Sequence, residues 1–227
     1  MSTTSFQDST LARSLQRETS AEVLFDDFSR GLYSTDASIY QIMPLGVVVP
    51  KTEEDVRSTL NIAYENGISV TMRGAGASQC GQTVGEGIIV DVSKNLKSLV
   101  SVDPEKRQAK VQPGIVLDQL NAMLKQHGLF FPVDVSTSSR ATIGGMTANN
   151  SCGARSIRYG KMVDNVIDVD AVLADGSSMR FGKLDEETAS AVQQSQQELV
   201  SQLIELGARE SEEVVKRFPR VQRRVRF

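Results

Sequence analysis

A short glycine-rich stretch, residues 68–82, constrains this chain more than any other part of its sequence. It reads I-S-V-T-M-R-G-A-G-A-S-Q-C-G-Q, and apolar residues alternate with polar ones up to Met72, which predicts a strand that ends at Arg73. Glycine lacks a Cβ and tolerates positive φ, and successive bare N–H groups form a nest for an anion. We interpret the loop as a diphosphate cradle, to which Arg73 adds a charge-assisted hydrogen bond. Its residues are small: Gly74, Ala75, Gly76, Ala77, Ser78 and Gly81.

A tight turn without a ligand is the alternative, and two familiar phosphate loops do not fit the sequence. A Walker A loop needs Lys-Ser or Lys-Thr after its last glycine, and neither follows Gly81. A Rossmann fingerprint opens directly into a helix, whereas here Gly85 and Gly87 continue the glycine pattern with no helical run between them. We therefore expect an anion site without a helix dipole behind it.

Composition excludes several classes of protein. The 227 residues suffice for one large domain or two small lobes, and the net charge of −3 gives no general argument for nucleic-acid binding. The sequence contains no run of about 18 apolar residues and no secretory signal. Cys80 and Cys152 are the only cysteines, which favours a reduced compartment and excludes an iron–sulfur cluster held by this chain alone. His127 is the only histidine, so we expect no metal site.

The first half of the chain predicts parallel strand pairing. An amphipathic helix is expected before residue 30, from the spacing of Leu11 and Leu15 and of Leu24 and Phe28. Residues 47–49 form an apolar strand, and Thr52 with an acidic residue three positions later begins a helix that runs to Gly67. A second strand then enters the glycine loop, which makes a βαβ unit, and residues 88–92 form a further strand.

The second half reads as hairpins, helices and one long polar connection. Residues 99–102 and 109–112 flank a turn, and a leucine stripe at residues 117–124 predicts a helix that ends at Gly128. His127 lies in its last turn, where a dipole-favoured helix end is preferred over a catalytic role. Residues 163–174 are strand-rich, Asp175-Gly176 predicts a two-residue hairpin turn, and residues 185–207 are expected to be helical.

Residues 130–160 carry little regular structure in this interpretation and many neutral polar side chains. Such groups suit a ligand with several hydroxyls and ring heteroatoms, and a solvated loop is the alternative. At the other end, residues 216–227 read K-R-F-P-R-V-Q-R-R-V-R-F. A solvated or partner-facing end is favoured for this basic stretch over the alternative, an arm that binds nucleic acid.

Two separated stretches together resemble one family. R-G-A-G-A-S-Q-C-G-Q resembles the diphosphate loop of FAD-linked oxidases of the vanillyl-alcohol oxidase / p-cresol methylhydroxylase type. A-T-I-G-G-M-T-A-N-N-S-C-G-A-R-S-I-R-Y-G resembles the second FAD segment of that family, as found in D-lactate dehydrogenases, glycolate oxidase flavoprotein subunits and D-2-hydroxyglutarate dehydrogenases. The likeness runs from about Asp27 to Asp185 and is greatest to large bacterial proteins that fuse the flavin domain to an iron–sulfur domain.

The resemblance implies a two-lobed α+β FAD-binding domain, with a small parallel βαβ sheet in the first lobe and a mixed or antiparallel sheet with helices in the second. The domain would span residues 27–210, split near 113, between an N-terminal tail and helix at 1–26 and a basic end at 211–227. Gly81 and Gln82 would close the diphosphate loop, and Pro132 and Asp134 match a proline-acid segment beside the cofactor. The residues expected to line the ribityl and flavin side are Thr142, Gly144, Gly145, Asn149, Asn150, Ser151 and Gly153.

Two departures from the family pattern matter for the cofactor. Some relatives attach FAD through a histidine near the diphosphate loop, where this chain has Ala77, Ser78 and Gln79, so we expect non-covalent FAD. Cys152 lies in the second motif, and a buried thiol is preferred there over a flavin link.

The resemblance implies oxidation of a D-2-hydroxy acid by hydride transfer to FAD. Relatives continue past a basic stretch into a substrate cap, which normally supplies the histidines that bind metal or take the substrate proton. We therefore expect this chain to be a fragment with unknown catalytic residues. A 2-hydroxy acid would bind through that cap, an iron–sulfur or quinone-linked acceptor would take the electrons, and we expect no nucleic acid or membrane span. The alternative is a non-catalytic remnant or partner-dependent half, and a nucleotide-binding module unrelated to redox rests on the glycine loop alone. A cytoplasmic place is expected, or a peripheral one at the inner membrane face for the complete protein.

Overall fold

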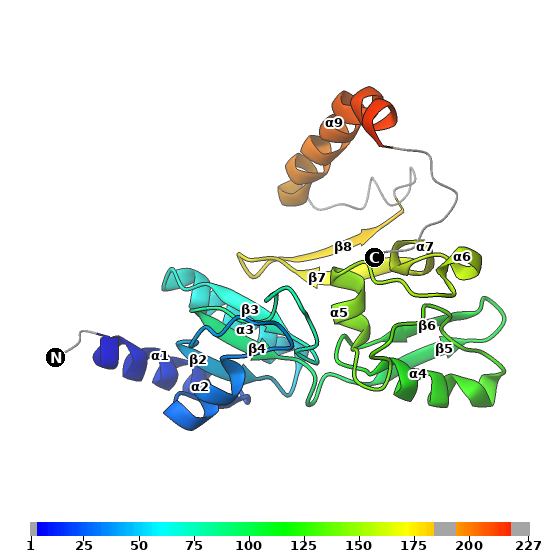
Figure 1. The fold of residues 1–227 in the computed structure, drawn as a ribbon. Coiled ribbons are helices and arrows are strands. Elements are labelled where there is room, and N and C mark those ends of the chain that lie inside the picture. The colour runs from blue at the N-terminus through cyan, green and yellow to red at the C-terminus, as the bar shows by residue number, and fades with distance from the viewer. Residues whose placement is uncertain (1–3, 184–193, 219–227) are drawn as a thin grey trace.

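The structure, a computed structural model, describes residues 4–183 and 194–218 and has two lobes side by side (Figure 1). The first lobe is built on a four-stranded sheet in the order β1-β2-β4-β3. Strands β2, β4 and β3 run parallel, and β1 is antiparallel at the edge. The predicted parallel pairing is therefore confirmed, with β4 lying between the two strands of the βαβ unit. Its elements are α1 (Thr4–Glu18), β1 (Glu22–Leu24), α2 (Asp27–Tyr33), β2 (Gly46–Val49), α3 (Glu53–Glu65), β3 (Val70–Arg73) and β4 (Ile88–Asp91).

Both faces of this sheet are covered, which explains why its central strands are continuously apolar. Val48 and Val90 pack with residues of α1 and α3 in one hydrophobic cluster, whereas Val47 and Ile89 form another with Tyr33 of α2. Helix α3 begins at the expected cap, where the Thr52 side chain and the acidic residue three positions later bond each other's backbone N–H groups. It ends before Gly67, whose φ is +64°.

The prediction of a single amphipathic helix before residue 30 is wrong in its second half. Helix α1 does bury Leu11 and Leu15. The chain then forms β1, in which Leu24 pairs opposite Val47, and restarts as α2 with Asp26 as its N-cap. Phe28 is 76% exposed, so the spacing of residues 24 and 28 does not mark a buried helix face.

The second lobe carries two separate antiparallel hairpins and several short helices, which agrees with the predicted α+β class. Its core begins with β5, because Leu99 already packs in the second cluster whereas Leu96 belongs to the first. The change of core thus comes earlier than residue 113. The elements are β5 (Leu99–Asp103), β6 (Gln108–Val111), α4 (Leu117–Leu124), the 3-10 helix η1 (Lys125–His127), α5 (Ile143–Ala148), α6 (Ser156–Tyr159), α7 (Met162–Asn165), β7 (Asp168–Val172) and β8 (Ser178–Gly182).

Residues 130–160 contain more regular structure than the sequence suggested, because α5 and α6 both lie there. Each is short and includes polar or glycine residues, so neither shows a helical apolar period. Helix α7 occupies residues expected to be strand.

The β7–β8 hairpin ties the second lobe back to α3, and Figure 1 shows its turn beside that helix. Arg57 of α3 donates to the Gly176 carbonyl at 3.3 Å and to the Ser178 hydroxyl. The turn is longer than the predicted two residues, since the Leu173 N–H donates to the Ser177 carbonyl at 2.8 Å around a Gly176 with φ +79°.

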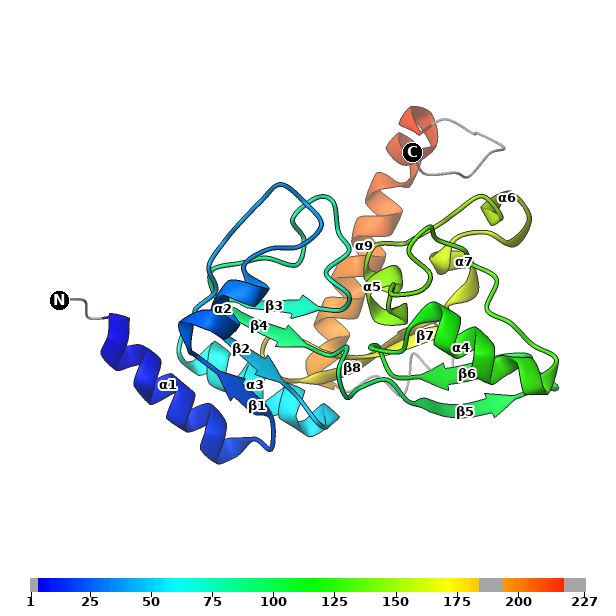
Figure 2. The ribbon, with the colours of Figure 1, turned by 60° about the horizontal axis from the view of Figure 1, so that its bottom comes forward.

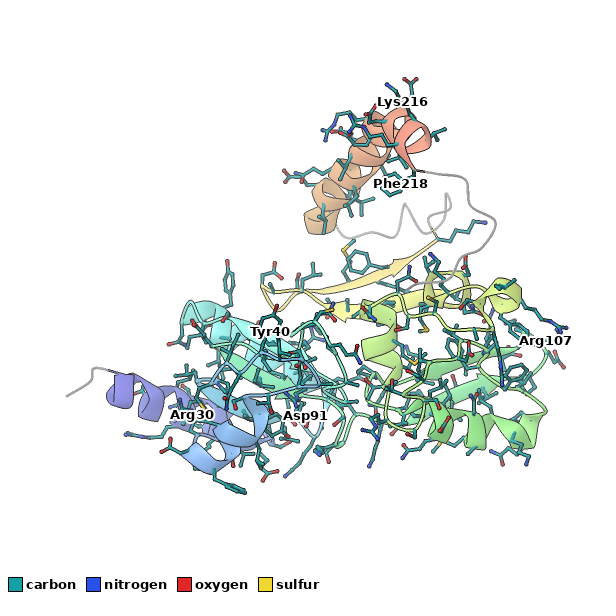
Figure 3. The ribbon with its side chains drawn as sticks, in the orientation of Figure 1. Arg30, Tyr40, Asp91, Arg107, Lys216 and Phe218 are labelled. Atoms are coloured by element: carbon teal, nitrogen blue, oxygen red, sulfur yellow. The ribbon has the colours of Figure 1, made fainter. Side chains whose placement is uncertain are left out.

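Helix α9 (Gln194–Arg217) stands apart from the two lobes in Figure 1, and Figure 3 shows Lys216 and Phe218 at its far end. The predicted apolar side is not buried: Leu203 and Leu206 are 49% and 44% exposed. The earlier part of that predicted helix lies outside the residues that the structure describes. Within the described ranges, no helix is both long enough and apolar enough to span a membrane.

Candidate functional site

The two motifs meet where the parallel strands end. The glycine loop follows β3, and in Figure 2 the arrowheads of β3 and β4 point toward α5 of the second lobe. Thr142, just before α5, is buried, and a Cβ built on Gly74 would lie 2.3 Å from its Oγ1. The two lobes therefore approach each other at a position that only glycine fits. Ligands of open α/β sheets bind outside this end of the strands.

The glycine loop has a left-handed backbone at Gly76, with φ +65°, and at Gly81, with φ +72°. The Ser78 hydroxyl donates to Gln82 Oε1 at 2.8 Å and accepts from the Cys80 N–H at 3.1 Å. These bonds close the second half of the loop on itself. The remaining loop residues carry no charge: Gly74, Ala75, Ala77 and Gln79.

Arg73 is turned toward the protein backbone rather than away from it. Its Nη1 donates to the carbonyls of Thr35 at 2.9 Å, Thr83 at 3.3 Å and Tyr33 at 3.4 Å. The direct hydrogen bond from Arg73 to a diphosphate thus stays a prediction, and it concerns nitrogens other than Nη1.

A short helix begins beside the loop, although the loop itself opens into none. Thr142 is the N-cap of α5, and its Oγ1 accepts from the Gly145 N–H at 3.3 Å. Gly144 packs on Pro113, where a Cβ would lie 2.6 Å from the proline Cβ, so its small size serves packing between segments. Gly145 is exposed, and a Cβ there would meet only the Thr142 hydroxyl.

The polar residues after α5 shape the second motif. Asn149 is the exposed C-cap of that helix, and its amide lies 3.4 Å from the Ser151 hydroxyl. Asn150 has φ +44° and accepts through Oδ1 from the Val163 N–H at 3.0 Å. Ser151 is buried. These side chains therefore fix the course of the chain between α5 and α7.

The proline-acid segment, which contains Pro132 and Asp134, contacts the same motif. Asp134 Oδ1 accepts from the Arg155 N–H at 3.0 Å. A Cβ built on Gly153 would lie 2.0 Å from the Asp134 carbonyl oxygen, so the two backbones touch. Pro132, two residues earlier, is half-buried. The structure thus brings Asp134 and Gly153 together.

Residues 33–40, here called the strap, wrap the glycine loop and were missed in the sequence. The Ala37 N–H donates to the Gly76 carbonyl at 3.0 Å. The Tyr40 ring would lie 2.6 Å from a Cβ on Gly81, and Figure 3 shows Tyr40 on the first lobe. The loop is therefore held by a segment that precedes it by more than thirty residues.

Asp36 anchors the strap. Its carboxylate accepts from the Ser38 N–H at 2.8 Å and from the Thr83 hydroxyl at 3.0 Å. Burial alone would raise the pKa of Asp36, but these hydrogen bonds outweigh burial and lower it. The D-A-S pattern of an Asx-turn was the one local signal that could have marked this segment.

Tyr33 begins the strap and is fixed by Asp91 at the end of β4. Its hydroxyl donates to Asp91 Oδ2 at 2.7 Å. Burial, and then this hydrogen bond, raise the pKa of Tyr33 well above its ordinary value, so the phenol keeps its proton.

His127 is exposed at the end of η1. Among the residues that the structure describes, no group of three or more histidine, cysteine or acidic residues is arranged to hold a metal ion.

The comparison with protein families identifies the domain. The FAD binding domain family matches residues 44–182, which include both motifs. The chain belongs to this family.

Curated relatives of this FAD binding domain are longer than the chain. D-2-hydroxyglutarate dehydrogenase of Pseudomonas putida is 35% identical over 208 residues, which are 89% of this chain and 21% of that protein. Glycolate oxidase subunit GlcD of Bacillus subtilis is 38% identical over 163 residues, which are 70% of this chain and 34% of that protein. The chain thus spans about a fifth to a third of these two proteins.

Solved structures share the fold of this FAD binding domain. An alkyldihydroxyacetonephosphate synthase superposes with a TM-score of 0.70 at 19% identity, over 79% of this chain and 35% of the other. Xylooligosaccharide oxidase from Myceliophthora thermophila has a TM-score of 0.67 at 20% identity, over 79% of this chain and 38% of the other. Both the predicted family and the predicted fold class are confirmed.

The residues present fit FAD, the family's cofactor and the predicted one. Bare peptide groups lie at the ends of the parallel strands, and residues 74–82 include no acidic side chain that would repel a diphosphate. The nearby Asp36 carboxylate is engaged by Ser38 and Thr83. The second motif excludes bulk at Gly74, so this position of the glycine loop is small for a structural reason as well.

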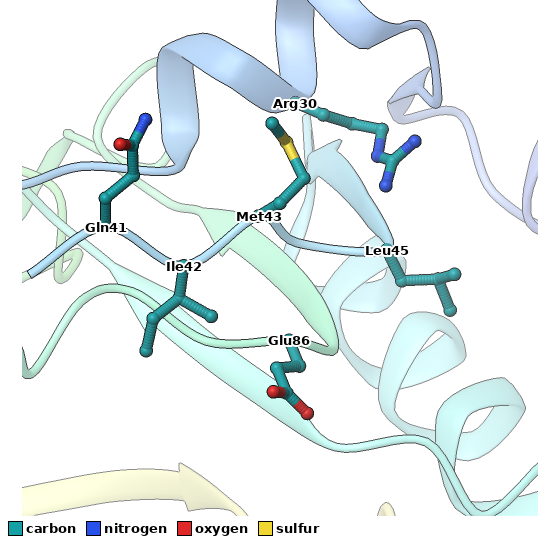
Figure 4. Close-up of a pocket in the computed structure, with 6 residues that line it drawn as sticks. All are labelled: Arg30, Gln41, Ile42, Met43, Leu45 and Glu86. Atoms are coloured by element: carbon teal, nitrogen blue, oxygen red, sulfur yellow. The ribbon is translucent and has the colours of Figure 1, made fainter.

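A separate shallow pocket of about 520 Å³ lies on the first lobe, as Figure 4 shows. Its lining combines apolar side chains with one acidic and one basic group: Arg30, Gln41, Ile42, Met43, Leu45 and Glu86. None of the predicted site residues lines it.

Proposed function

We propose that this chain is the FAD-binding part of a flavin-dependent dehydrogenase that oxidises a D-2-hydroxy acid. The observation that carries the proposal is the meeting of Gly74 with Thr142, which joins the two motifs into one site. The names of the relatives, D-2-hydroxyglutarate dehydrogenase and glycolate oxidase subunit GlcD, support the substrate class.

In this proposal the glycine loop holds the diphosphate of a non-covalent FAD. Its backbone N–H groups supply donors, and Ser78 with Gln82 closes the loop. The side of the site made by Thr142, Gly145 and Asn149 faces the ribityl chain and the flavin. Asp134 and Gly153 hold the backbone of that side in place. Four further residues have the same supporting role: Gly144, Asn150, Ser151 and Pro132. Arg73 keeps a positive charge beside the loop.

In this proposal the groups of this chain bind and orient the cofactor. Bound FAD would accept the hydride from the carbon that carries the hydroxyl, which leaves a 2-oxo acid once the hydroxyl proton is lost. His127 is exposed at a helix end, and a positioned base typically contributes about 10²–10⁴-fold. We therefore propose that a further region of the complete protein binds the hydroxy acid, and that an iron–sulfur or quinone-linked acceptor takes the electrons.

The first experiment measures FAD binding by the purified chain. The expected result is a flavin absorbance band, with FAD as the released cofactor after heat denaturation. Gly76→Val places a branched side chain at positive φ within the loop, so flavin occupancy should fall sharply while the far-UV circular dichroism stays unchanged. Gly31→Ala is the matched control, because a Cβ there meets nothing within 4 Å. Equal flavin occupancy in Gly76→Val and the wild type would contradict the cradle.

The second experiment separates binding from turnover. Anaerobic bleaching of the flavin band is followed with D-2-hydroxyglutarate, D-lactate and glycolate. The chain alone is expected to bind FAD and to bleach slowly, because in this proposal a further region of the complete protein orients the substrate and excludes water. Rapid bleaching by any of the three acids would show that this chain suffices for catalysis. A chain that takes up no FAD would favour the non-catalytic alternative.

A further inference from the structure

We infer that Arg73 is a positioning residue for the cofactor, which clasps the glycine loop to the strap instead of serving mainly as a charge for the diphosphate. This inference rests on the proposed function, since the loop is taken to be the FAD cradle. It assigns Arg73 a role different from the direct ionic contact that its place in the sequence suggests.

The hydrogen bonds of Arg73 connect three segments that the sequence separates. Nη1 donates to the carbonyls of Tyr33 and Thr35 in the strap and to the carbonyl of Thr83, just after the loop. Main-chain carbonyls outside the ladders of strands and helices still need hydrogen-bond donors, so the half-buried guanidinium of Arg73 satisfies acceptors that the regular structure leaves open. One side chain therefore fixes the strap and the far end of the loop together.

The Arg73 guanidinium is itself held in place by Tyr33. Its Cζ lies 5.2 Å from the centroid of the Tyr33 ring, within the range of a cation–π contact. The hydroxyl of the same tyrosine donates to Asp91 Oδ2 at 2.7 Å, and Asp91 is 3% exposed at the end of β4. Arg73, here called the clasp, is thus anchored through Tyr33 on the buried carboxylate of Asp91 in the central sheet.

Arg73 lies against the loop at Gly76, the residue with the left-handed backbone. A Cβ built on Gly76 would lie 2.6 Å from Arg73 Nη2, and the Gly76 carbonyl accepts from the strap through Ala37. Gly76 is therefore fixed from both the arginine and the strap. A nest binds an anion well when its N–H groups are already aligned, because no free energy is then spent on ordering the loop.

Arginine and lysine should differ at this site even though both are cations. A guanidinium is planar, carries five donors and stacks on an aromatic ring, whereas an ammonium is compact and strongly hydrated. If Arg73 acts as a clasp, Arg73→Lys should weaken FAD binding about tenfold or more, close to the effect of Arg73→Gln. If Arg73 acts as a charge, lysine should preserve most of the affinity.

The test uses the full chain and two measurements. FAD affinity is measured by flavin fluorescence titration for the wild type, Arg73→Lys and Arg73→Gln. Loop order is measured without FAD, from the anisotropy of a fluorophore on the exposed Cys80 in a Cys152→Ser background. Arg30→Gln is the control, because Arg30 also donates to a main-chain carbonyl, that of Pro44 at 2.8 Å, within the same lobe.

The clasp predicts that both Arg73 variants lose affinity and show lower anisotropy at Cys80, while Arg30→Gln changes neither. Retained affinity in Arg73→Lys with loss in Arg73→Gln, or wild-type anisotropy in both, would overturn it. Should Arg73→Lys fail to fold, Tyr33→Phe removes only the anchor on Asp91, and an unchanged anisotropy there would overturn the clasp. A wild type that binds no FAD contradicts the proposed function, and the anisotropy then still decides the clasp.

Discussion

The Thr142 hydroxyl occupies the place that a side chain on Gly74 would need, with 2.3 Å between Oγ1 and the position of a Cβ. Gly74 begins the loop after a parallel strand of the first lobe, and Thr142 caps a helix of the second lobe. One contact therefore joins the two sequence motifs and the two lobes. It also gives Gly74 a reason to be glycine that does not depend on a ligand.

This contact predicts coupling between the two residues. Gly74→Ala should lower the free energy of unfolding by about 1–3 kcal/mol through overpacking, and Thr142→Ala should lower it by about 1 kcal/mol through loss of the α5 cap. The double variant should lose less than the sum, because Thr142→Ala removes the atom that the new Cβ strikes. Urea unfolding of the four proteins gives the coupling free energy. Strict additivity would mean that the two residues do not touch.

Gly153→Ala should be more damaging than Gly74→Ala. A Cβ there would lie 2.0 Å from the Asp134 carbonyl oxygen, and a main-chain atom cannot rotate away as a side chain can. We expect a loss of about 3 kcal/mol or more in unfolding free energy. Gly31→Ala, in α2 with open space around it, should be neutral or stabilising by up to about 1 kcal/mol in the same urea titration. Comparable stabilities for the two variants would contradict the close approach of Asp134 and Gly153.

The sequence allowed prediction of features that depend on neighbouring residues. The Thr52 cap, the Gly67 helix end and the β5–β6 hairpin each follow from a few adjacent side chains, and all three are present. The α5 helix escaped prediction because I-G-G-M-T-A has two glycines and no apolar period, while its stability comes from the Thr142 cap and from packing of Met146 in the second core.

The site needed the tertiary structure for a different reason. Its residue types predicted a cradle, but spacing along a chain does not say that Thr142 lies against Gly74. The direction of Arg73 was unpredictable as well, because its acceptors are backbone carbonyls, which every residue carries. The strap has no composition that separates it from an ordinary loop, apart from the short D-A-S pattern at Asp36.

Asp55 should give the protein part of its stability above about pH 4. Burial alone would raise its pKa, but the N–H groups of Ser20 at 2.7 Å, Lys51 at 2.8 Å and Thr52 at 3.0 Å donate to the carboxylate and lower the pKa below its ordinary value. A carboxyl with a lower pKa in the folded state stabilises fully above its unfolded pKa of about 3.9, and this contribution is lost as the pH falls through the folded pKa.

Asp55→Asn tests this sign. At pH 7 the variant should be less stable by about 1.5–3 kcal/mol, because an amide cannot accept all of these charge-assisted hydrogen bonds. The difference from the wild type should shrink as the pH falls below about 4. Urea unfolding between pH 7 and pH 3 measures it, with Asp118→Asn on the exposed side of α4 as the control. A difference that stays constant across this range would refute the role given to the carboxylate.

The last prediction concerns the joint between the β7–β8 hairpin and α3. A Cβ on Gly176 would lie 1.6 Å from Asn61 Oδ1, and Gly176 has φ +79°. Gly176→Ala therefore meets two obstacles, a collision with α3 and an unfavourable backbone conformation. Asn61→Ala removes the collision only, so the double variant should regain part of the lost stability and remain about 1–2 kcal/mol below Asn61→Ala alone. Unfolding free energies from urea titration separate the two terms. Full recovery in the double variant would mean that the turn accepts alanine freely, and no recovery would mean that the hairpin does not rest on Asn61.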